Sequence, residues 1–248
     1  RKSDTVDNIR AVLFDLDGTI YYGSKLIPEA DQVVKKYRQE GKKIFFMTNN
    51  STKSRKQIWE KLTGMGLKCS YDEVYTSGYA AALYAKQMGY HTVYIMGSKA
   101  LEEEFGELDI TVSDQAEVVI VGYDMTFDYQ KLTDALQVAF HADKIIACNK
   151  ERHYPGENAK RMPGCGAMVG ALEGSLGREV DYSVGKPNPL LMEIICKDND
   201  LRPEEVVVVG DTYESDIVMA QNYGSSAVYI GEEDHKDIKC IHAIGELL

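Results

Sequence analysis

Short hydrophobic runs alternate with helical stretches along this chain. Four of the runs read as buried strands: Ala11 to Phe14, Lys43 to Met47, Val206 to Val209 and Ala227 to Ile230. Their hydrophobicity is almost continuous, which is typical of parallel strands that are covered on both faces. The pattern therefore predicts an α/β protein with a parallel sheet at its centre.

The stretch between the first two strands predicts a helix. In Pro28 to Gly41, the apolar residues Ala30, Val33, Val34 and Tyr37 keep helical spacing, and Gly41 marks the end. The two strands and this helix form a βαβ unit.

A second helix is expected from near Ser54, where Ser54 and Gln57 fit a capping box, to the glycines Gly64 and Gly66. A short strand at Glu73 to Thr76 follows.

The middle of the chain has an alternation of its own. Strands are expected at His91 to Met96, Val118 to Gly122 and Lys144 to Cys148, with a helix over Tyr129 to Ala142. These elements are enough for a separate small α/β lobe. We expect a discontinuous core formed by residues 1–78 and 183–248, with an inserted lobe at 79–182.

Composition narrows the classes of partner. The chain has 248 residues, 44% hydrophobic and 27% charged, and no apolar run as long as a membrane span. The formal charge of -11 repels nucleic acid, and no basic stripe offsets it. We therefore expect neither a membrane nor a nucleic acid as partner. An anionic substrate requires a metal ion or local cations in the site.

The five cysteines are odd in number and widely spread, and they form neither a CxxC pair nor a zinc spacing. Reduced thiols and a cytoplasmic location are the expectation. Because the chain does not begin with Met, a targeting segment before Arg1 stays open. The sequence leaves the oligomeric state open as well, and a homo-oligomer is compatible with it.

The segment Phe14-Asp15-Leu16-Asp17-Gly18-Thr19 ends a buried strand in two carboxylates and a glycine turn. Ligands of open α/β sheets bind at the carboxyl ends of the strands. Residues two apart in an extended chain point to the same side, so Asp15 and Asp17 can face one ligand. Two close carboxylates suit a hard divalent cation. Taken alone, the two aspartates are also compatible with a simple turn.

Other strand ends carry matching side chains. Thr48, Asn49 and Asn50 offer a hydroxyl, backbone N–H groups and an amide to phosphate oxygens. After Val206 to Val209 comes Gly210-Asp211-Thr212-Tyr213-Glu214-Ser215-Asp216, in which Asp211 is placed to be a metal ligand. Taken alone, Asn50 is a turn residue and Asp216 a helix N-cap.

A lysine lies beside a fixed backbone in Gly185-Lys186-Pro187-Asn188-Pro189. Proline sets the backbone at a helix start and keeps Lys186 extended. Taken alone, such a lysine is usually a solvated side chain.

In this order, DLDGT, TNN, GKP and GDxxxSD resemble the four motifs of haloacid dehalogenase (HAD)-like hydrolases. The resemblance implies a doubly wound, flavodoxin-like core that uses Mg²⁺. Asp15 is then the nucleophile and Asp17 the general acid/base. Thr48, Asn49 and Lys186 hold the phosphate. Asp15, Asp211 and the backbone carbonyl of Asp17 bind the metal, and Asp216 supports the metal and its water shell.

The intervals between the motifs identify the branch. Asp15 and Thr48 are too close for an intervening helical cap, whereas the interval from Thr48 to Lys186 accommodates the expected lobe. This layout is similar to the NagD-like, 4-nitrophenylphosphatase-like branch, whose α/β cap lies between the second and third motifs. Its members act on small phosphomonoesters such as sugar phosphates, nucleoside monophosphates, phosphoglycolate or pyridoxal phosphate.

Three segments of the lobe resemble cap segments of that branch: 119–124, 148–151 and 161–168. Asn50, Asn149 and Arg161 are the candidates for contact with the leaving group, although each is also compatible with a loop or surface role. His153 and Cys165 are further candidates, and Cys165 equally fits a small residue at a glycine-rich helix start. The branch usually has aspartate where this chain has Glu151, and threonine is common where it has Cys148.

The resemblance implies a phosphatase that works through an aspartyl phosphate. A phosphotransferase or mutase uses the same intermediate but passes the phosphoryl group to a hydroxyl acceptor. A non-catalytic phosphate-binding protein is the alternative from another class. Every side chain that the motifs require for catalysis is present, which favours the phosphatase.

Overall fold

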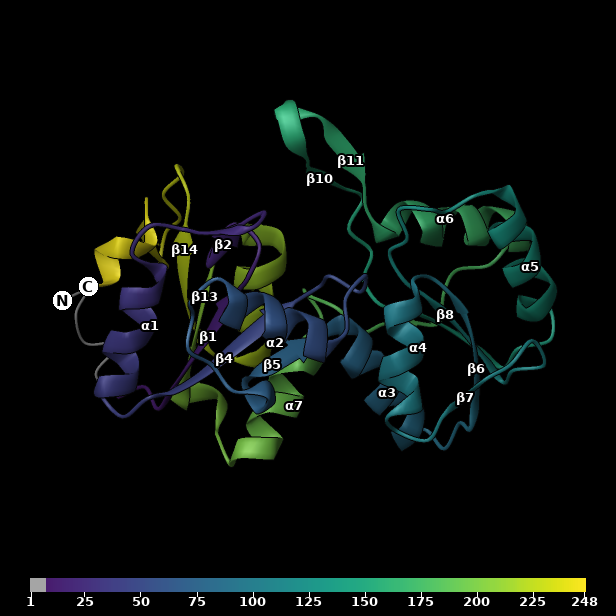
Figure 1. Cartoon of the computed structure of the whole chain (residues 1–248), viewed down its shortest axis with the longest axis horizontal. Coiled ribbons are helices and arrows are strands. Elements are labelled where there is room, and N and C mark those ends of the chain that lie inside the picture. The colour runs from purple at the N-terminus through teal and green to yellow at the C-terminus, as the bar shows by residue number, and fades with distance from the viewer. Residues whose placement is uncertain (1–7) are drawn as a thin grey trace. The chain divides into compact units, whose positions relative to one another are not determined.

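The computed structural model describes residues 8–248, and Figure 1 traces the chain through two compact units. The first unit comprises the chain up to Thr48, then Lys56–Tyr75 and Lys186–Leu248. The second comprises Asn49–Arg55 and Thr76–Gly185. Residues 1–7 of the expected core lie outside the described residues.

A six-stranded sheet forms the centre of the first unit, in the order β15-β14-β13-β1-β4-β5. Its strands are β1 (Ala11–Asp15), β4 (Lys43–Thr48), β5 (Val74–Thr76), β13 (Val206–Gly210), β14 (Ser226–Ile230) and β15 (Lys239–Ile241). The central strand β1 pairs in parallel with β4 and β13, so that Phe14 lies opposite Phe46 and Val209. All five residues of β1 are buried, because both of its faces are covered.

The order of these strands reverses at β1. From β1 the chain continues to β4 and β5 on one side, and it later returns through β13, β14 and β15 on the other side. This is the doubly wound α/β core that the sequence predicts. In such sheets the reversal point marks a crevice at the carboxyl ends of the strands.

Helices α1 (Ala30–Gln39), α2 (Arg55–Gly64), α7 (Leu190–Asn199) and α8 (Val218–Tyr223) complete the first unit. The buried face of α1 consists of Ala30, Val33, Val34 and Tyr37, the four residues whose spacing predicts the helix. They join Val12, Phe14 and Phe46 in one hydrophobic cluster.

The second unit contains a five-stranded sheet in the order β12-β9-β8-β6-β7. Its strands are β6 (Thr92–Met96), β7 (Thr111–Val112), β8 (Val118–Val121), β9 (Lys144–Ala147) and β12 (Tyr182–Ser183). Its helices are α3 (Ser77–Gln87), α4 (Lys99–Gly106), α5 (Tyr129–Ala139) and α6 (Cys165–Leu176). Ala135, Val138, Val169 and Leu172 of α5 and α6 pack against Val119 and Val121 of β8.

Two hairpins project from these layers. Strands β2 (Tyr21–Tyr22) and β3 (Lys25–Leu26) pair directly after the Asp15 segment. In the second unit, β10 (His153–Pro155) and β11 (Arg161–Pro163) pair antiparallel, and Figure 1 shows them extending beyond helix α6. The ring of Tyr154 meets that of Tyr123 edge to face at 5.5 Å between centroids, and their hydroxyls are hydrogen-bonded.

The boundaries of the second unit differ slightly from the expected 79–182. The structure begins its main part at Thr76 and ends it at Gly185, and it adds Asn49–Arg55. The carbonyl of Asn49 accepts hydrogen bonds from Ser77 and Asn149, which joins this short segment to the second unit. These partners are distant in sequence, so no local pattern reveals the assignment.

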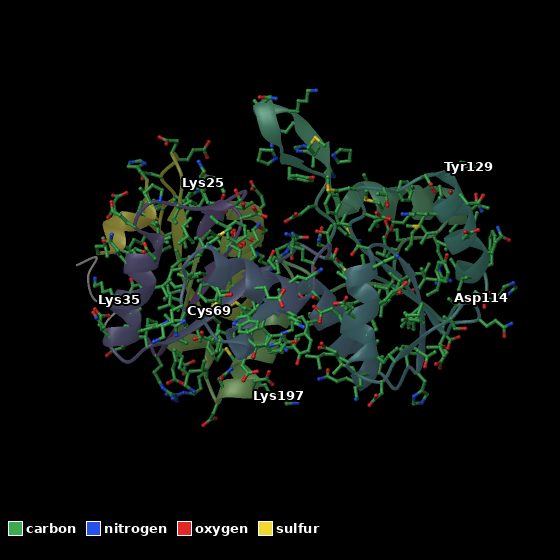
Figure 2. The ribbon with its side chains drawn as sticks, in the orientation of Figure 1. Lys25, Lys35, Cys69, Asp114, Tyr129 and Lys197 are labelled. Carbon is green, nitrogen blue, oxygen red and sulfur yellow. The ribbon has the colours of Figure 1, made fainter. Side chains whose placement is uncertain are left out.

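Charged side chains such as Lys25, Lys35 and Lys197 lie at the surface (Figure 2). The five cysteines all fall within the described residues and are free thiols. Among residues 8–248, no helix combines the length and the apolar character that crossing a membrane requires.

Candidate active site

Three acidic side chains and one lysine gather in the first unit, at the strand ends where the sheet reverses. Asp15 is the last residue of β1, Asp211 follows β13, and Asp216 lies in the π-helical turn Tyr213–Ile217. Each of the three aspartates offers a carboxylate oxygen, and these oxygens lie within 4.8 Å of one another. The motifs that the sequence places at separate strand ends therefore converge.

Lys186 binds two of these carboxylates. Its Nζ lies 2.6 Å from Oδ1 of Asp15 and 2.6 Å from Oδ1 of Asp216. The side chains of Lys186 and Asp216 are 3% and 0% exposed, so water screens neither charge. The lysine is thus a buried counterion rather than a solvated side chain.

The cluster formed by the three aspartates and Lys186 contains more acidic groups than basic ones. Burial, and next the neighbouring Asp15 carboxylate, raise the pKa of Asp211 and the pKa of Asp216. Burial alone would lower the pKa of Lys186, but the carboxylates of Asp15 and Asp216 outweigh it and raise that pKa. Three carboxylates around one ammonium favour binding of a further cation. Oxygen donors of this kind fit a hard divalent ion, so the residues present fit a metal site.

Glycine is required beside two of the aspartates. Gly18 has a φ of 84°, and a Cβ at this position would overlap the carboxylate of Asp211. A Cβ at Gly210 would overlap the carboxylate of Asp216. The turns after β1 and at the end of β13 therefore let backbone and carboxylates approach closely.

Two threonines hold Asp211. The hydroxyls of Thr19 and Thr212 each donate to Oδ1 of Asp211 over 3.4 Å, and the backbone N–H of Thr212 donates to Asp216. The sequence analysis does not identify either hydroxyl as a site residue. The only signal for these hydroxyls in the sequence is that both threonines adjoin the acidic motifs.

Asp17 is exposed, and its backbone forms an isolated bridge with Tyr21. Burial raises the pKa of Tyr21, and the charge of Asp17 raises it further. Asp17 therefore lies next to the buried Tyr21 ring, while its side chain is not part of the three-carboxylate group.

Thr48 ends β4 as a buried residue of the first unit, whereas Asn49 begins the second unit. The side-chain amide of Asn49 donates to Oε1 of Glu151 over 3.0 Å. Phosphate binding by Thr48 and Asn49 stays a prediction.

The candidates for contact with a leaving group lie in the second unit. Asn50 accepts hydrogen bonds from the backbone and hydroxyl of Thr52, which is the turn role. Asn149 is buried and accepts from the backbone N–H of Glu151, while Arg161 is exposed on β11. Their contact with substrate stays a prediction.

Cys165 is buried at the start of α6, and its thiol donates to the carbonyl of Val121 over 3.7 Å. His153 is exposed on β10. The contact of Cys165 fits the structural alternative, a small residue at a helix start.

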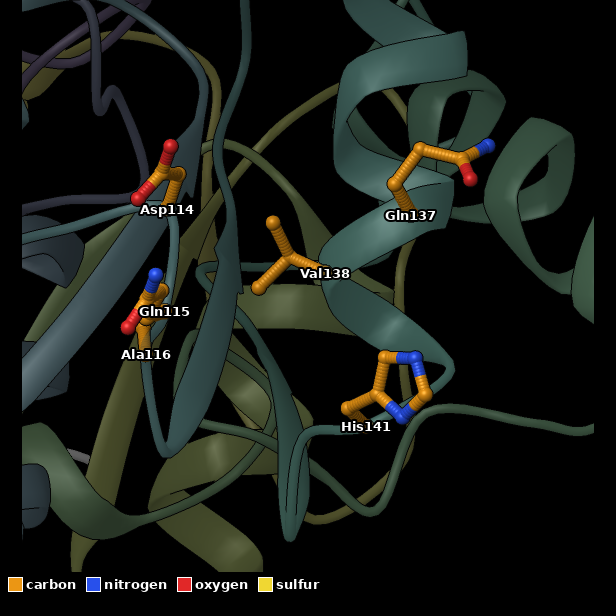
Figure 3. Close-up of a pocket in the computed structure, with 6 residues that line it drawn as sticks. All are labelled: Asp114, Gln115, Ala116, Gln137, Val138 and His141. Carbon is orange, nitrogen blue, oxygen red and sulfur yellow. The ribbon is translucent and has the colours of Figure 1, made fainter.

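Two cavities lie within the second unit. One of about 320 Å³ is lined by Asp114, Gln115, Ala116, Gln137, Val138 and His141. Figure 3 shows that the first three come from one extended segment, whereas Gln137 and Val138 come from α5 and His141 lies just after its end.

The other cavity, of about 380 Å³, lies where β6 and β8 end and is lined in part by Lys99 and Lys131. Lys131 is paired with Asp124 at 2.8 Å. Among the described residues, the acidic group suited to a metal is therefore the one at Asp15.

Two family models match stretches of the chain that contribute to the first unit. The family model described as haloacid dehalogenase-like hydrolase matches residues 12–111, and a second HAD-hydrolase-like model matches residues 183–243. Together these ranges contain the converging acidic residues and Lys186.

Individual proteins match over nearly the whole chain. Sugar-phosphatase AraL of Bacillus subtilis is 32% identical over 92% of this chain and 85% of its own length. The crystal structure of 4-nitrophenylphosphatase from Thermotoga maritima superposes with a TM-score of 0.91 at 26% identity, covering 98% of this chain and 97% of that one.

Glycerol phosphate phosphatase from Mycobacterium tuberculosis was solved in complex with magnesium. It superposes with a TM-score of 0.83 at 28% identity, covering 93% of this chain and 71% of that one.

Proposed function

Because the chain belongs to the haloacid dehalogenase-like hydrolase family and is a phosphatase of that type, we propose that it hydrolyses small phosphomonoesters through an aspartyl phosphate on Asp15. The observation that carries the proposal is the buried ion-pair cluster of Lys186, Asp15 and Asp216, with Asp211 beside it. It combines a carboxylate nucleophile with a fixed positive charge at the carboxyl end of the sheet.

Mg²⁺ is the cofactor in this proposal. Asp15, Asp211 and the backbone carbonyl of Asp17 would hold it, and Asp216 would support it. When bound, the ion neutralises negative charge on the phosphate and on the carboxylates around it. The magnesium complex of the glycerol phosphate phosphatase relative supports this choice of ion.

The reaction begins with attack of the Asp15 carboxylate on phosphorus, which forms the aspartyl phosphate and breaks the bond to the leaving alkoxide. Asp17 gives its proton to that alkoxide. It then accepts a proton from the water that hydrolyses the aspartyl phosphate. Lys186 stays protonated because two carboxylates raise its pKa, so it can stabilise negative charge in both transition states.

The relatives support the substrate class that we propose. They include a sugar phosphatase, a 4-nitrophenylphosphatase and a glycerol phosphate phosphatase. We propose a small phosphorylated metabolite of this kind, with the second unit acting as the cap that selects it. Asn149 and the exposed Arg161 are the residues to test for the leaving group.

Phosphate release from a panel of sugar phosphates, glycerol phosphate, phosphoglycolate and 4-nitrophenyl phosphate tests the proposal. We expect turnover with Mg²⁺ and its loss with EDTA, and the folded Asp15→Asn variant should be inactive because an amide cannot act as the nucleophile. Activity retained in Asp15→Asn would exclude covalent catalysis by this residue. If added alcohols receive most of the phosphoryl groups, the protein is a phosphotransferase instead.

Asp17 has a separate test. We expect Asp17→Asn to slow alkyl phosphates about 100-fold or more and 4-nitrophenyl phosphate much less in the first step, since nitrophenolate departs without a proton. Burst kinetics separate this step from hydrolysis of the aspartyl phosphate. Equal losses in the first step for both esters would contradict the acid role.

A further inference from the structure

Glu104 is a buried carboxylate that the proposed reaction does not use. It lies in α4 and is 2% exposed. Its Oε1 accepts hydrogen bonds from the backbone N–H of Arg55 at 2.7 Å and from the hydroxyl of Thr76 at 3.2 Å. A carboxylate in such a place is costly unless hydrogen bonds compensate it, so its position calls for a reason.

The two donors mark two of the four places where the chain passes between the units. Arg55 is the last residue of the short segment that belongs to the second unit, and Thr76 is the first residue after the chain returns. One carboxylate oxygen therefore holds two of the four chain crossings. Neither contact is local in sequence, since α4 begins well after Thr76.

Each of these two crossings is also the start of a helix. Arg55 is the first residue of α2, and Thr76 caps α3 by accepting the backbone N–H of Tyr79 at 3.0 Å. The guanidinium of Arg55 lies 3.9 Å from the centroid of the Tyr79 ring. The positive ends of both helix dipoles thus adjoin Glu104, and the backbone N–H of Arg55, one of the donors that α2 cannot satisfy itself, is satisfied by it.

The fit around the carboxylate is tight. A Cβ at Gly78 of α3 would lie 2.8 Å from Cδ2 of Leu101 and 3.6 Å from Cγ of Glu104. Glycine at this position therefore lets helices α3 and α4 approach each other without displacing Leu101. The approach brings Glu104 within reach of Thr76.

We propose that Glu104 is a positioning residue for the phosphatase reaction, in which it clasps two of the four chain crossings to the second unit and so fixes where the chain can turn at these two crossings. With these two crossings held, the chain can turn there only at the bonds just outside Arg55 and Thr76. Cap movement admits substrate and excludes water in enzymes with this kind of lid. The consequence for turnover rests on the proposed function, whereas the clasp itself does not.

The ionisation of Glu104 makes the clasp testable. Burial raises the pKa of Glu104 to about 7, while the hydrogen bond and charge of Arg55 oppose this more weakly. The other ionisable groups that face it are the carboxylate of Glu107 on its own helix and the buried thiol of Cys148.

Because the pKa is raised, the clasped state binds a proton more tightly than an open state with Glu104 in water. The clasp is firmest below the ordinary pKa of glutamate and weakens as the pH rises through about 7.

Hydrogen exchange followed by mass spectrometry, on the full chain without substrate, measures the clasp at the amide of Arg55. After correction for intrinsic exchange, we expect opening in the wild type to increase about 30-fold from about pH 5.5 to about pH 8.5. Glu104→Gln keeps a neutral acceptor of the same shape, so opening at Arg55 should change less than about threefold. Glu103→Gln, an exposed neighbour on α4, is the control and should behave as the wild type. The same pH dependence in Glu104→Gln would overturn the proposal.

Thr76 gives an independent test. We expect Thr76→Val to lower kcat/KM about tenfold and Thr76→Ser to stay within about twofold, because serine keeps the hydroxyl. Failure of Thr76→Ser to restore kcat/KM, or unchanged kcat/KM in Thr76→Val, would overturn the positioning role. An inactive wild type would refute the proposed function while leaving the exchange result to decide the clasp.

Discussion

Lys186 is a buried residue that we expect to affect both the stability and the turnover of this protein. It binds Asp15 and Asp216 at 2.6 Å each, so one ammonium group is shared by two carboxylates. Removing one partner of a buried ion pair leaves an uncompensated charge. The lysine is therefore expected to matter for stability and for turnover together.

We predict that Lys186→Met lowers turnover about 1,000-fold, because the transition state loses a fixed positive charge. The free energy of unfolding of the metal-free protein should fall by about 3 kcal/mol. Phosphate release and urea denaturation measure the two effects. Lys197→Met, at an exposed site, is the control and should change neither. Normal turnover in Lys186→Met would contradict the proposed phosphate contact.

Gly18 offers a second test with a matched partner. Gly18 and Gly23 both have positive φ, but only at Gly18 does an added Cβ meet a neighbour, the Asp211 carboxylate. We predict that both alanine variants lose about 1 kcal/mol of stability, and that only Gly18→Ala loses about 100-fold or more in activity. Thermal unfolding and turnover separate the two effects. Equal activities in the two variants would show that Asp211 does not need this close approach.

The sequence singles out Asp15, Asp211, Asp216 and Lys186 from separate motifs, and the structure brings these side chains together, while their roles stay predictions. It does not reveal the hydroxyls of Thr19 and Thr212 on Asp211. That contact depends on where the Asp211 side chain lies, which only the packed turns determine.

At the scale of elements, the strands are the part that the sequence predicts best. Buried parallel strands have continuous hydrophobic runs, so β1, β4, β13 and β14 are confirmed within a residue or two. Helices α3 and α4 are not predicted. The buried face of α3 is made largely of small residues, such as Ala80, Ala81 and Ala85, and therefore gives little periodic signal.

An aromatic pair links the hairpin β10–β11 to the rest of the second unit. Tyr154 on β10 packs edge to face against Tyr123, beyond the end of β8. Such a pair contributes about 0.5–1.5 kcal/mol beyond its buried area. We predict that Tyr154→Ala increases trypsin cleavage after Lys160 and Arg161 about 3- to 10-fold.

Tyr129→Ala, which removes an 85% exposed ring on α5, is the control and should leave the cleavage rate unchanged. If Tyr154→Ala resists trypsin as the wild type does, the hairpin is held by its own strand pairing alone.

At the scale of the whole molecule, the protonation of the buried carboxylates, the binding of Mg²⁺ and the stability of the fold should depend on one another. Raised pKa values at Asp211 and Asp216 mean that the metal-free fold binds protons more tightly than the unfolded chain does. This contribution to stability is complete at acidic pH and is lost as the pH rises through the raised pKa values. Mg²⁺ competes with the same protons.

We therefore predict that saturating Mg²⁺ raises the Tm by about 5 °C or more at about pH 8.5 and by much less at about pH 5. Scanning calorimetry with EDTA or Mg²⁺ measures the shift. Asp211→Asn should remove most of it. An equal shift at both pH values would argue against a metal bound by these carboxylates.

The division of the molecule was the hardest feature to predict. Hydrophobic pattern alone places an insertion within a few residues of its observed ends, but it assigns 49–55 to the core. The hydroxyl of Ser51 accepts from the backbone N–H of Tyr123, and its carbonyl accepts from Ser98. Only these contacts with residues far away in the sequence show that the segment belongs to the second unit.

That short segment has a practical meaning for protein engineering. A chimera made by transplanting only residues 76–185 from a relative would leave 49–55 facing foreign partners in place of Ser77, Ser98 and Tyr123. Recombination should therefore exchange two separate pieces of gene at once, with the crossover points after Thr48, Arg55, Tyr75 and Gly185. The last of these junctions falls directly before the codon of Lys186, the buried partner of Asp15 and Asp216, so its position must be kept.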